Sequence, residues 1–223
     1  MDASRLLHFR SDLHLSRKAF HMGMGLLVLF VYLKAGLTRA QGLSILGFFF
    51  VLTFTVETLR LYNAKFNETF IKVWGPLLRS CETNRYSGTP YYIASMMIAI
   101  AIFPKPVAVI AIAFLAIGDP VASFFGILYG KKSIRFSNGK SLIGTMAGVF
   151  ACIATALVAL RLLEPLFTLS LTFEHWLILS IVGGVAGGFA ELLPLEVDDN
   201  FSIPVVSGFA LWVLFVVMGV VTH

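Results

Sequence analysis

Long apolar stretches separated by short polar segments run through the whole 223-residue chain. A helix needs about 20 mostly apolar residues to cross the ~30 Å hydrocarbon core of a bilayer, and most of these stretches approach that length. The pattern predicts an all-α integral membrane protein with seven transmembrane helices in one membrane-embedded domain, residues 1–223. The predicted spans cover residues 20–33, 42–59, 90–103, 107–129, 141–163, 175–193 and 204–221.

Two further segments alternate apolar and charged residues at helical spacing. Residues 1–17 carry Leu6, Phe9 and Leu13 on one face, which predicts a helix lying on the membrane surface. Residues 63–80 mix aromatic and charged side chains and predict an interfacial helix that ends near Gly75.

The basic residues give the chain a net charge of +5, and most of its 17 lysines and arginines lie in short loops on the amino-terminal side of the membrane. By the positive-inside rule we expect a cytoplasmic amino terminus and an outer carboxyl terminus. This placement explains the basic charge better than a nucleic-acid-binding face does. The two cysteines, Cys81 and Cys152, are dispersed and predict neither a disulfide framework nor a zinc site.

One acid, Asp119, interrupts the fourth predicted span. A carboxylate at the centre of a transmembrane helix costs about 2.5–3.5 kcal/mol on insertion scales, so it indicates a functional site by default. The alternative is a helix-packing acid paired with a Lys or His. Pro120 follows and predicts a kink in the helix. Small residues recur at four-residue steps, where another backbone can approach closely: Gly118, Ala122, Gly126 and Gly130.

A polar turn follows the same span and leads into the next predicted helix. Charge-assisted hydrogen bonds from Lys and Arg suit a polyphosphate, and a helix amino terminus attracts anions. We therefore predict a nucleotide-binding turn, although the cations could also act only as signals of orientation. The predicted nucleotide-binding residues are Lys131, Lys132, Arg135, Lys140, Ser141 and Gly144.

An acidic loop between the last two predicted spans faces the same side as the basic turn. It contains Asp198, Asp199 and Asn200 and has no Lys or Arg. Magnesium is commonly held by one or two carboxylates together with water and phosphate oxygens. We predict a Mg²⁺ site formed by these three residues and Asp119, the alternative being an ordinary solvated loop.

Several other polar residues stand at the cytoplasmic ends of predicted spans. Arg17 and His21 share one helical face beside Lys18, an arrangement that would also suit a membrane anchor. Glu57 closes the second span, and Glu191 ends the sixth, where function and close packing are equally good explanations. We treat these residues as supporting a site at this membrane surface.

Blocks of the sequence, taken in order, resemble a known family. The early blocks are Arg17-Lys18 with His21, Glu57 with Arg60, and Gly88 before Tyr91-Tyr92. The later ones are Gly118-Asp119 with Gly126, Gly130, Lys131, Lys140-Ser141 and Gly144, then Asp198-Asp199-Asn200 with Ile203-Pro204. Together they resemble the CTP-dependent polyprenol kinases, namely dolichol, phytol and farnesol kinases and the CTP-dependent diacylglycerol kinase. They are more remotely similar to phosphatidate cytidylyltransferases. The family usually has Glu where this chain has Ile143.

The resemblance implies an enzyme that transfers the terminal phosphoryl group of CTP to the hydroxyl of a membrane polyprenol, isoprenoid alcohol or diacylglycerol. We expect Asp119, Lys131 and Asp199 to be catalytic, with Asp119 acting as general base or second metal ligand. The resemblance also favours a compact prokaryotic protein of the inner or plasma membrane, with its active site facing the cytoplasm.

Two other functions stay open on the sequence alone. A phosphatidate cytidylyltransferase would use the same nucleotide and metal but release pyrophosphate. A small membrane transporter would use Asp119 as an ion-coupling residue. The sequence leaves open which lipid alcohol is used and whether the protein forms a homo-oligomer.

Overall fold

The computed structural model describes residues 15–167, 169–192 and 199–220, and within these ranges the fold is all-α. The only strand-like pairing there is an isolated bridge between Arg135 and Ser141. The helices are α1 Leu15–Lys34, α2 Arg39–Tyr62, α3 Ala64–Trp74, α4 Gly88–Ile102, α5 Lys105–Ala113, α6 Asp119–Tyr129, α7 Leu142–Leu166, α8 Phe173–Phe189 and α9 Asp199–Val217. The predicted fold class is therefore confirmed, whereas the surface helix over residues 1–17 lies mostly outside the described residues.

Each of the seven predicted spans falls largely within a helix or a continuous run of helices. Among the described residues, five segments are long and apolar enough to cross a membrane. They are Arg39–Tyr62, Lys105–Tyr129, Leu142–Leu166, Phe173–Leu192 and Asn200–Val217. Helix α4 is apolar but shorter, and α1 is not among the five. The structure thus supports a membrane protein, while the count of seven spans and its orientation stay predictions.

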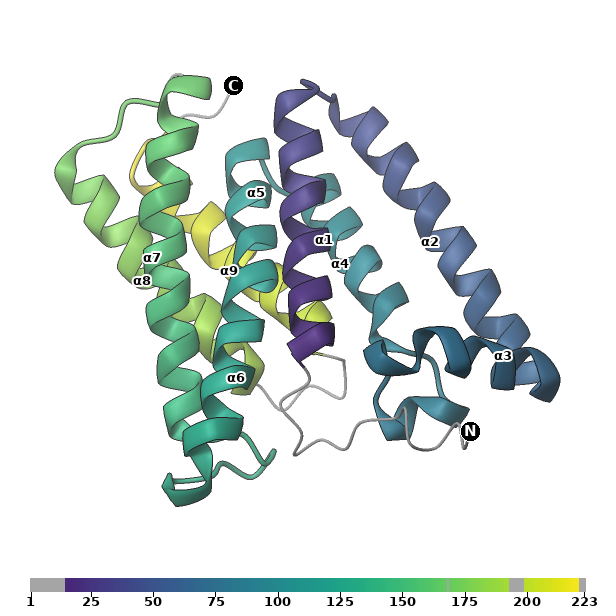
Figure 1. The fold of residues 1–223 in the computed structure, drawn as a ribbon. Coiled ribbons are helices and arrows are strands. Elements are labelled where there is room, and N and C mark those ends of the chain that lie inside the picture. The colour runs from purple at the N-terminus through teal and green to yellow at the C-terminus, as the bar shows by residue number, and fades with distance from the viewer. Residues whose placement is uncertain (1–14, 168, 193–198, 221–223) are drawn as a thin grey trace.

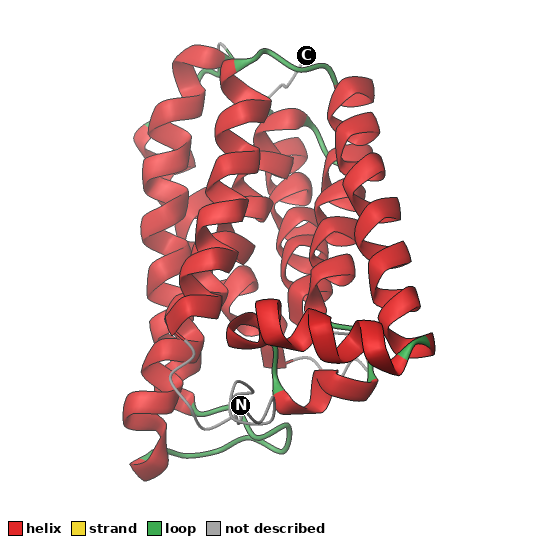
Figure 2. Ribbon diagram, turned by 45° about the vertical axis from the view of Figure 1, so that its right-hand side comes forward, coloured by secondary structure: helices red, strands yellow, loops and turns green. Residues whose placement is uncertain are grey.

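The long helices run between two ends of the molecule, and the polar segments of interest gather at one of them. Figure 1 shows the start of α1, helix α3 and the connection from α6 to α7 at its lower end. Figure 2 shows the long helices as an upright bundle, with shorter helical segments lying across that end. Helix α3 forms where predicted and is followed by a 3₁₀ turn at Gly75–Leu77.

The small-residue ridge on α6 packs against α7 at close range. A Cβ added to Gly144 would lie 2.8 Å from the carbonyl oxygen of Ala122 and 2.9 Å from the Cα of Gly126. On the other side of α7, a Cβ on Gly188 would lie 2.6 Å from the Cα of Val149. These spacings leave no room for a side chain, so the predicted backbone approach is confirmed.

Helix α5 forms the centre of the bundle and is interrupted just before Asp119. Phe114–Gly118 make one π-helical turn, after which α6 begins with Asp119 and Pro120. Such wide turns are rare in proteins, but those that do occur are often found at functional sites. Pro120 has no amide hydrogen to donate, which fits the first turn of a helix. The predicted kink is thus a π-helical turn immediately before the proline, within fully buried surroundings that include Phe114 and Leu115.

Candidate active site

His21 on α1 faces the acid that follows the π-helical turn. Its Nε2 lies 4.0 Å from Oδ2 of Asp119, and the two side chains are 13% and 22% exposed. This separation exceeds a direct hydrogen bond. The same Nε2 atom is buried and has no hydrogen-bond partner among the described residues. A buried ring nitrogen and a carboxylate therefore face each other without forming a hydrogen bond.

Tyr92 on α4 fixes the position of His21. The tyrosine hydroxyl donates a hydrogen bond of 2.9 Å to the His21 carbonyl oxygen. The two rings also contact each other, with their centroids 4.0 Å apart. Gly25, one turn further along α1, allows this approach, because an added Cβ would lie 2.5 Å from the Cβ of Ala116. The imidazole is thus held between α4 and the π-helical turn.

Lys18 adds positive charge near Asp119. Burial lowers the pKa of its ammonium group from the ordinary lysine value, and the Asp119 carboxylate opposes that shift. Arg79 and Arg17 lower the Lys18 pKa further, because like charges disfavour protonation. Three cations therefore lie near two carboxylates, Asp119 and Glu82, and Arg17 is paired with Glu82 at 3.0 Å.

The basic turn between α6 and α7 folds back on itself. The amide of Leu142 donates to the carbonyl of Ile134, and the amide of Phe136 donates to that of Lys140, both at 2.9 Å. Gly139 closes the turn with a φ of +80°, a conformation that favours glycine. Within the turn, Lys132 and Arg135 are exposed, while the side chain of Lys131 lies outside the described part of the structure.

Lys140 reaches inward from this turn to Glu191 at the end of α8. Its Nζ lies 3.0 Å from Oε2 of Glu191, whose other carboxylate oxygen accepts a hydrogen bond of 3.0 Å from Thr145. Asn138 donates to the Glu191 carbonyl at 3.2 Å. Glu191 therefore contacts both the basic turn and α7, and its contacts with Lys140 and Asn138 attach the turn to α8.

The first four amides of α7 all donate hydrogen bonds within the protein. The hydroxyl of Ser141 accepts from the amide of Gly144 at 3.2 Å, and that of Ser133 accepts from Ile143 at 3.2 Å. The remaining first-turn amides, those of Leu142 and Thr145, donate to backbone carbonyls. A phosphate at this helix end would have to displace these bonds, so the lysine side chains are the better phosphate ligands here.

Asp119 and Glu191 border one small cavity of about 10 Å³, which Cys152 and Ile203 also line. That volume suits about one water molecule. Among the described residues there is no group of three or more His, Cys, Asp or Glu side chains placed to hold a metal. Asp198 and the side chain of Asp199 lie outside the described part, so the magnesium site stays a prediction.

Glu57 and Arg60 belong to a buried network that the sequence did not reveal. Arg60 is fully buried and donates to Oε2 of Glu57 at 2.6 Å, while Glu57 also accepts from the amide of Ser87 at 2.8 Å. Nearby, Glu82 accepts from Arg17 at 3.0 Å. The roles of Glu82 and Ser87 were missed because they depend on contacts between distant segments. The network binds the end of α2 to the loop before α4.

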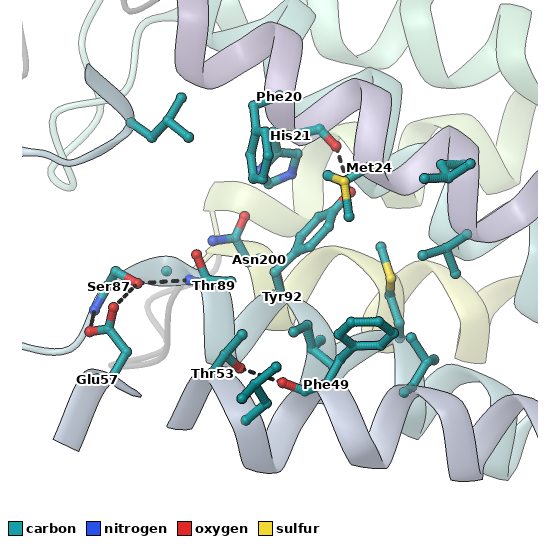
Figure 3. A pocket seen from close by; sticks show the side chains of 18 of the residues that line it. Phe20, His21, Met24, Phe49, Thr53, Glu57, Ser87, Thr89, Tyr92 and Asn200 are labelled. Carbon is teal, nitrogen blue, oxygen red and sulfur yellow. Dashed lines mark hydrogen bonds between the residues drawn. The ribbon is translucent and has the colours of Figure 1, made fainter. Parts of the chain in front are cut away.

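A cavity of about 600 Å³ opens beside His21 between α1, α2 and α4. Most of its lining is apolar, and the polar residues gather at one end. Figure 3 shows Asn200, Thr89 and Tyr92 around that end, with Glu57 bonded to Ser87 close by. The cavity thus joins a long apolar compartment to the polar groups of the site.

The fold and site define a membrane protein in which an apolar cavity meets a buried histidine, a carboxylate and several cations. CTP-dependent diacylglycerol kinase 1 of Schizosaccharomyces pombe is 30% identical over 89% of this chain and 92% of its own length. The enzyme of the same name from Eremothecium gossypii is 32% identical over 86% of this chain and 64% of its own length. A probable phytol kinase 1 from Oryza sativa is 24% identical over 57% of this chain and 42% of its own.

The chain therefore belongs to the family of CTP-dependent lipid kinases that includes these diacylglycerol and phytol kinases, the CTP-dependent polyprenol kinase family. No protein-family model and no solved structure matches it. The relatives named here are fungal and plant proteins, which gives no support to the expected prokaryotic origin.

Proposed function

We propose that this protein transfers the terminal phosphoryl group of CTP to the hydroxyl of a membrane lipid, with diacylglycerol as the first acceptor to test. The observation that carries the proposal is the apolar cavity whose polar end holds His21 close to Asp119. The names of the relatives favour CTP as donor and diacylglycerol as acceptor. Polyprenols and isoprenoid alcohols are the other acceptors that the family suggests.

In the proposed reaction the lipid hydroxyl oxygen attacks the terminal phosphorus of CTP. An oxygen–phosphorus bond forms to the lipid, the bond to the bridging oxygen breaks, and CDP leaves. The hydroxyl proton passes to Asp119, whose carboxylate is partly buried and positioned 4.0 Å from His21. A positioned base of this kind contributes roughly 10²–10⁴-fold to rate.

The anionic donor is proposed to lie between the start of α1 and the basic turn. We assign its phosphates to Arg17 and Lys18 of α1 and to Lys131, Lys132 and Arg135 of the turn. Of these, Arg17 is paired with Glu82 at 3.0 Å. Lys140 also belongs to that set, although it is paired with Glu191. Phosphoryl transfer depends mainly on positioning and on neutralising charge, which such cations supply.

Magnesium is the metal we propose for this site. Mg²⁺ is usually bound by one or two carboxylates together with substrate phosphates, and the partly exposed carboxylate of Asp119 fits that pattern. Asp198, Asp199 and Asn200 are the other proposed ligands. When bound, the ion would neutralise charge on the phosphates.

We also propose that seven helices cross the membrane, with the amino terminus and the catalytic end in the cytoplasm. Five described segments have the length and composition of a span. The distribution of lysine and arginine supports the orientation. The proposed compartment is also the one in which CTP is made available.

The decisive experiment uses purified protein, CTP labelled on its terminal phosphate, Mg²⁺ and a panel of lipids. We expect label in phosphatidate when diacylglycerol is supplied, together with release of CDP. Label in a polyprenyl or phytyl phosphate instead would support a lipid kinase with a different acceptor. Release of labelled pyrophosphate with phosphatidate as substrate would show that the protein is a cytidylyltransferase and not a kinase.

A further inference from the structure

The large cavity is a groove with two matching walls. The residues that line it from α1 and from α2 both recur at three- and four-residue steps, so each helix contributes a single face. Helix α2 packs against α4, whereas α1 packs against α5 and the π-helical turn. Because the two walls rest on different neighbours, they do not close on each other, and α4 forms the floor between them (Figure 1).

The groove is about as long as one extended fatty acyl chain. Its lining on α2 runs from Gly42 to Glu57, which corresponds to about 22 Å at a rise of ~1.5 Å per residue. An extended polypeptide advances at most ~3.6 Å for three backbone bonds, or about 1.2 Å per bond. An all-trans hydrocarbon chain of similar advance would need about 18 carbons to fill that length.

The volume of the groove suits one such chain better than two. A cavity of about 150 Å³ binds benzene, which has six carbons. The groove has about 600 Å³, so the same proportion gives space for roughly 24 carbons. Two chains of about 18 carbons each would need about half as much volume again.

The groove is accessible from the side that the proposed topology places in the bilayer. Leu27 on α1 and Phe49 on α2 line it and are 51% and 47% exposed. At its polar end, Thr89 and Asn200 lie near His21, as Figure 3 shows. A lipid could therefore slide in laterally and bring its hydroxyl to the acid–histidine pair without leaving the membrane.

We propose that this groove binds a single hydrocarbon chain of the lipid substrate, while the second chain of a diacylglycerol stays in the surrounding bilayer. The inference rests on the proposed lipid kinase function and adds to it the part of the substrate that is recognised. It also accounts for one family accepting both two-chain and one-chain alcohols, because only one chain enters in either case.

The test uses two tryptophan substitutions that block the groove at different depths. Val28 lies seven residues, about 10 Å, beyond His21 along α1. Ile45 lies twelve residues, about 18 Å, from Glu57 along α2. Matched controls replace residues of the same helices that are exposed but do not line the groove, Leu26→Trp and Val51→Trp.

Each variant is assayed with diacylglycerols whose two chains have 8, 12 or 18 carbons. We expect Val28→Trp to retain activity only with the shortest chains, and Ile45→Trp to lose only the longest. The expected loss in kcat/KM is about tenfold or more, the discrimination that one ill-fitting methylene produces in an apolar pocket. The controls should treat all lengths as the wild type does. Activity with the short substrate shows that each variant is folded.

Diacylglycerols with one short and one long chain decide how many chains enter. For Val28→Trp, shortening the chain at one glycerol position should restore activity, and shortening the other should not. Restoration only when both are short would overturn single-chain binding. Loss of activity that ignores chain length would overturn the groove as the binding site. A wild-type protein inactive on every lipid would instead refute the proposed kinase function itself.

Discussion

Lys140 and Glu191, which are 51 positions apart in the sequence, form an ion pair of 3.0 Å that joins the basic turn to the end of α8. The lysine side chain is 20% exposed and the glutamate side chain 5%. Removing one partner of a buried pair leaves an uncompensated charge and costs about 3–5 kcal/mol, whereas removing both can cost little. Together with the hydrogen bond from Asn138 to the Glu191 carbonyl, the pair therefore anchors the turn to the end of α8.

The first prediction concerns this pair. Lys140→Ala should lower the free energy of unfolding by about 3 kcal/mol, because the Glu191 carboxylate would stay buried without its cation. The double variant with Glu191→Gln should be less destabilised than Lys140→Ala alone. Unfolding of the purified variants in detergent measures both. Strictly additive losses would show that the two side chains do not depend on each other.

The second prediction concerns the proposed base. Asp119→Asn removes the carboxylate but keeps the shape of the side chain, so lipid phosphorylation should fall by about 10²–10⁴-fold with little loss of stability. Glu68→Gln is the matched control, because Glu68 is an exposed acid paired with Lys72 on α3. An Asp119→Asn enzyme with near-normal kcat would remove Asp119 from both the base and the metal-ligand assignments.

The third prediction is a pH dependence at Lys18. Burial lowers the pKa of Lys18, so this side chain loses its positive charge at a lower pH than an ordinary lysine does. If that charge binds the phosphates, kcat/KM for CTP should fall on the alkaline side. Lys18→Arg should shift this fall to higher pH, because guanidinium stays protonated. An alkaline limb unchanged by Lys18→Arg would assign the fall to another group.

The fourth prediction concerns Arg60, which is fully buried and donates to Glu57, Asn67 and the carbonyls of residues 82, 83 and 85. Lysine has three donors and lacks the planar fork, so Arg60→Lys should lower the free energy of unfolding by about 3 kcal/mol. Arg161→Lys, at a side chain 76% exposed, is the control and should change stability little. Equal thermal midpoints for the two variants would contradict this.

The fifth prediction is a magnesium requirement. Chelation should abolish phosphoryl transfer, and added Mg²⁺ should restore it, because the metal neutralises charge on the nucleotide. In the absence of lipid, CTP with Mg²⁺ should raise the thermal midpoint of the wild type and raise that of Asp119→Asn less. Full transfer activity after exhaustive chelation would show that lysine and arginine side chains alone neutralise the charge on the phosphates.

The fold was largely predictable because hydrophobic periodicity is a local property. The helices, the small-residue packing of α6 on α7 and the helix at Ala64–Trp74 were all indicated by residues near one another in sequence. The π-helical turn at Phe114–Gly118 was not, since no local pattern distinguishes it from a proline kink.

The sequence named several residues that the structure brings close together, but it did not indicate the partners of these residues. His21 and Asp119 were both named, yet their 4.0 Å approach depends on how α1 packs beside the π-helical turn. Glu191 could be assigned to function or packing only once its bonds to Lys140 and Thr145 were known. The start of α7 was predicted to attract phosphate, but the hydroxyls of Ser133 and Ser141 accept hydrogen bonds from two of its amides.

The π-helical turn also determines what a change of chain length would do here. A π-helical turn closes its hydrogen bonds over one residue more than an α-helical turn does. Deleting one residue from Phe114–Gly118 would therefore let the chain continue as ordinary α-helix, and the Asp119 carboxylate would keep nearly the same direction. A deletion of this kind elsewhere in an α-helix would turn everything after it by about 100°. The π-helical turn is thus a place where the chain can lose a residue without changing what Asp119 faces, a property of backbone spacing that a survey of amino-acid identities alone would overlook.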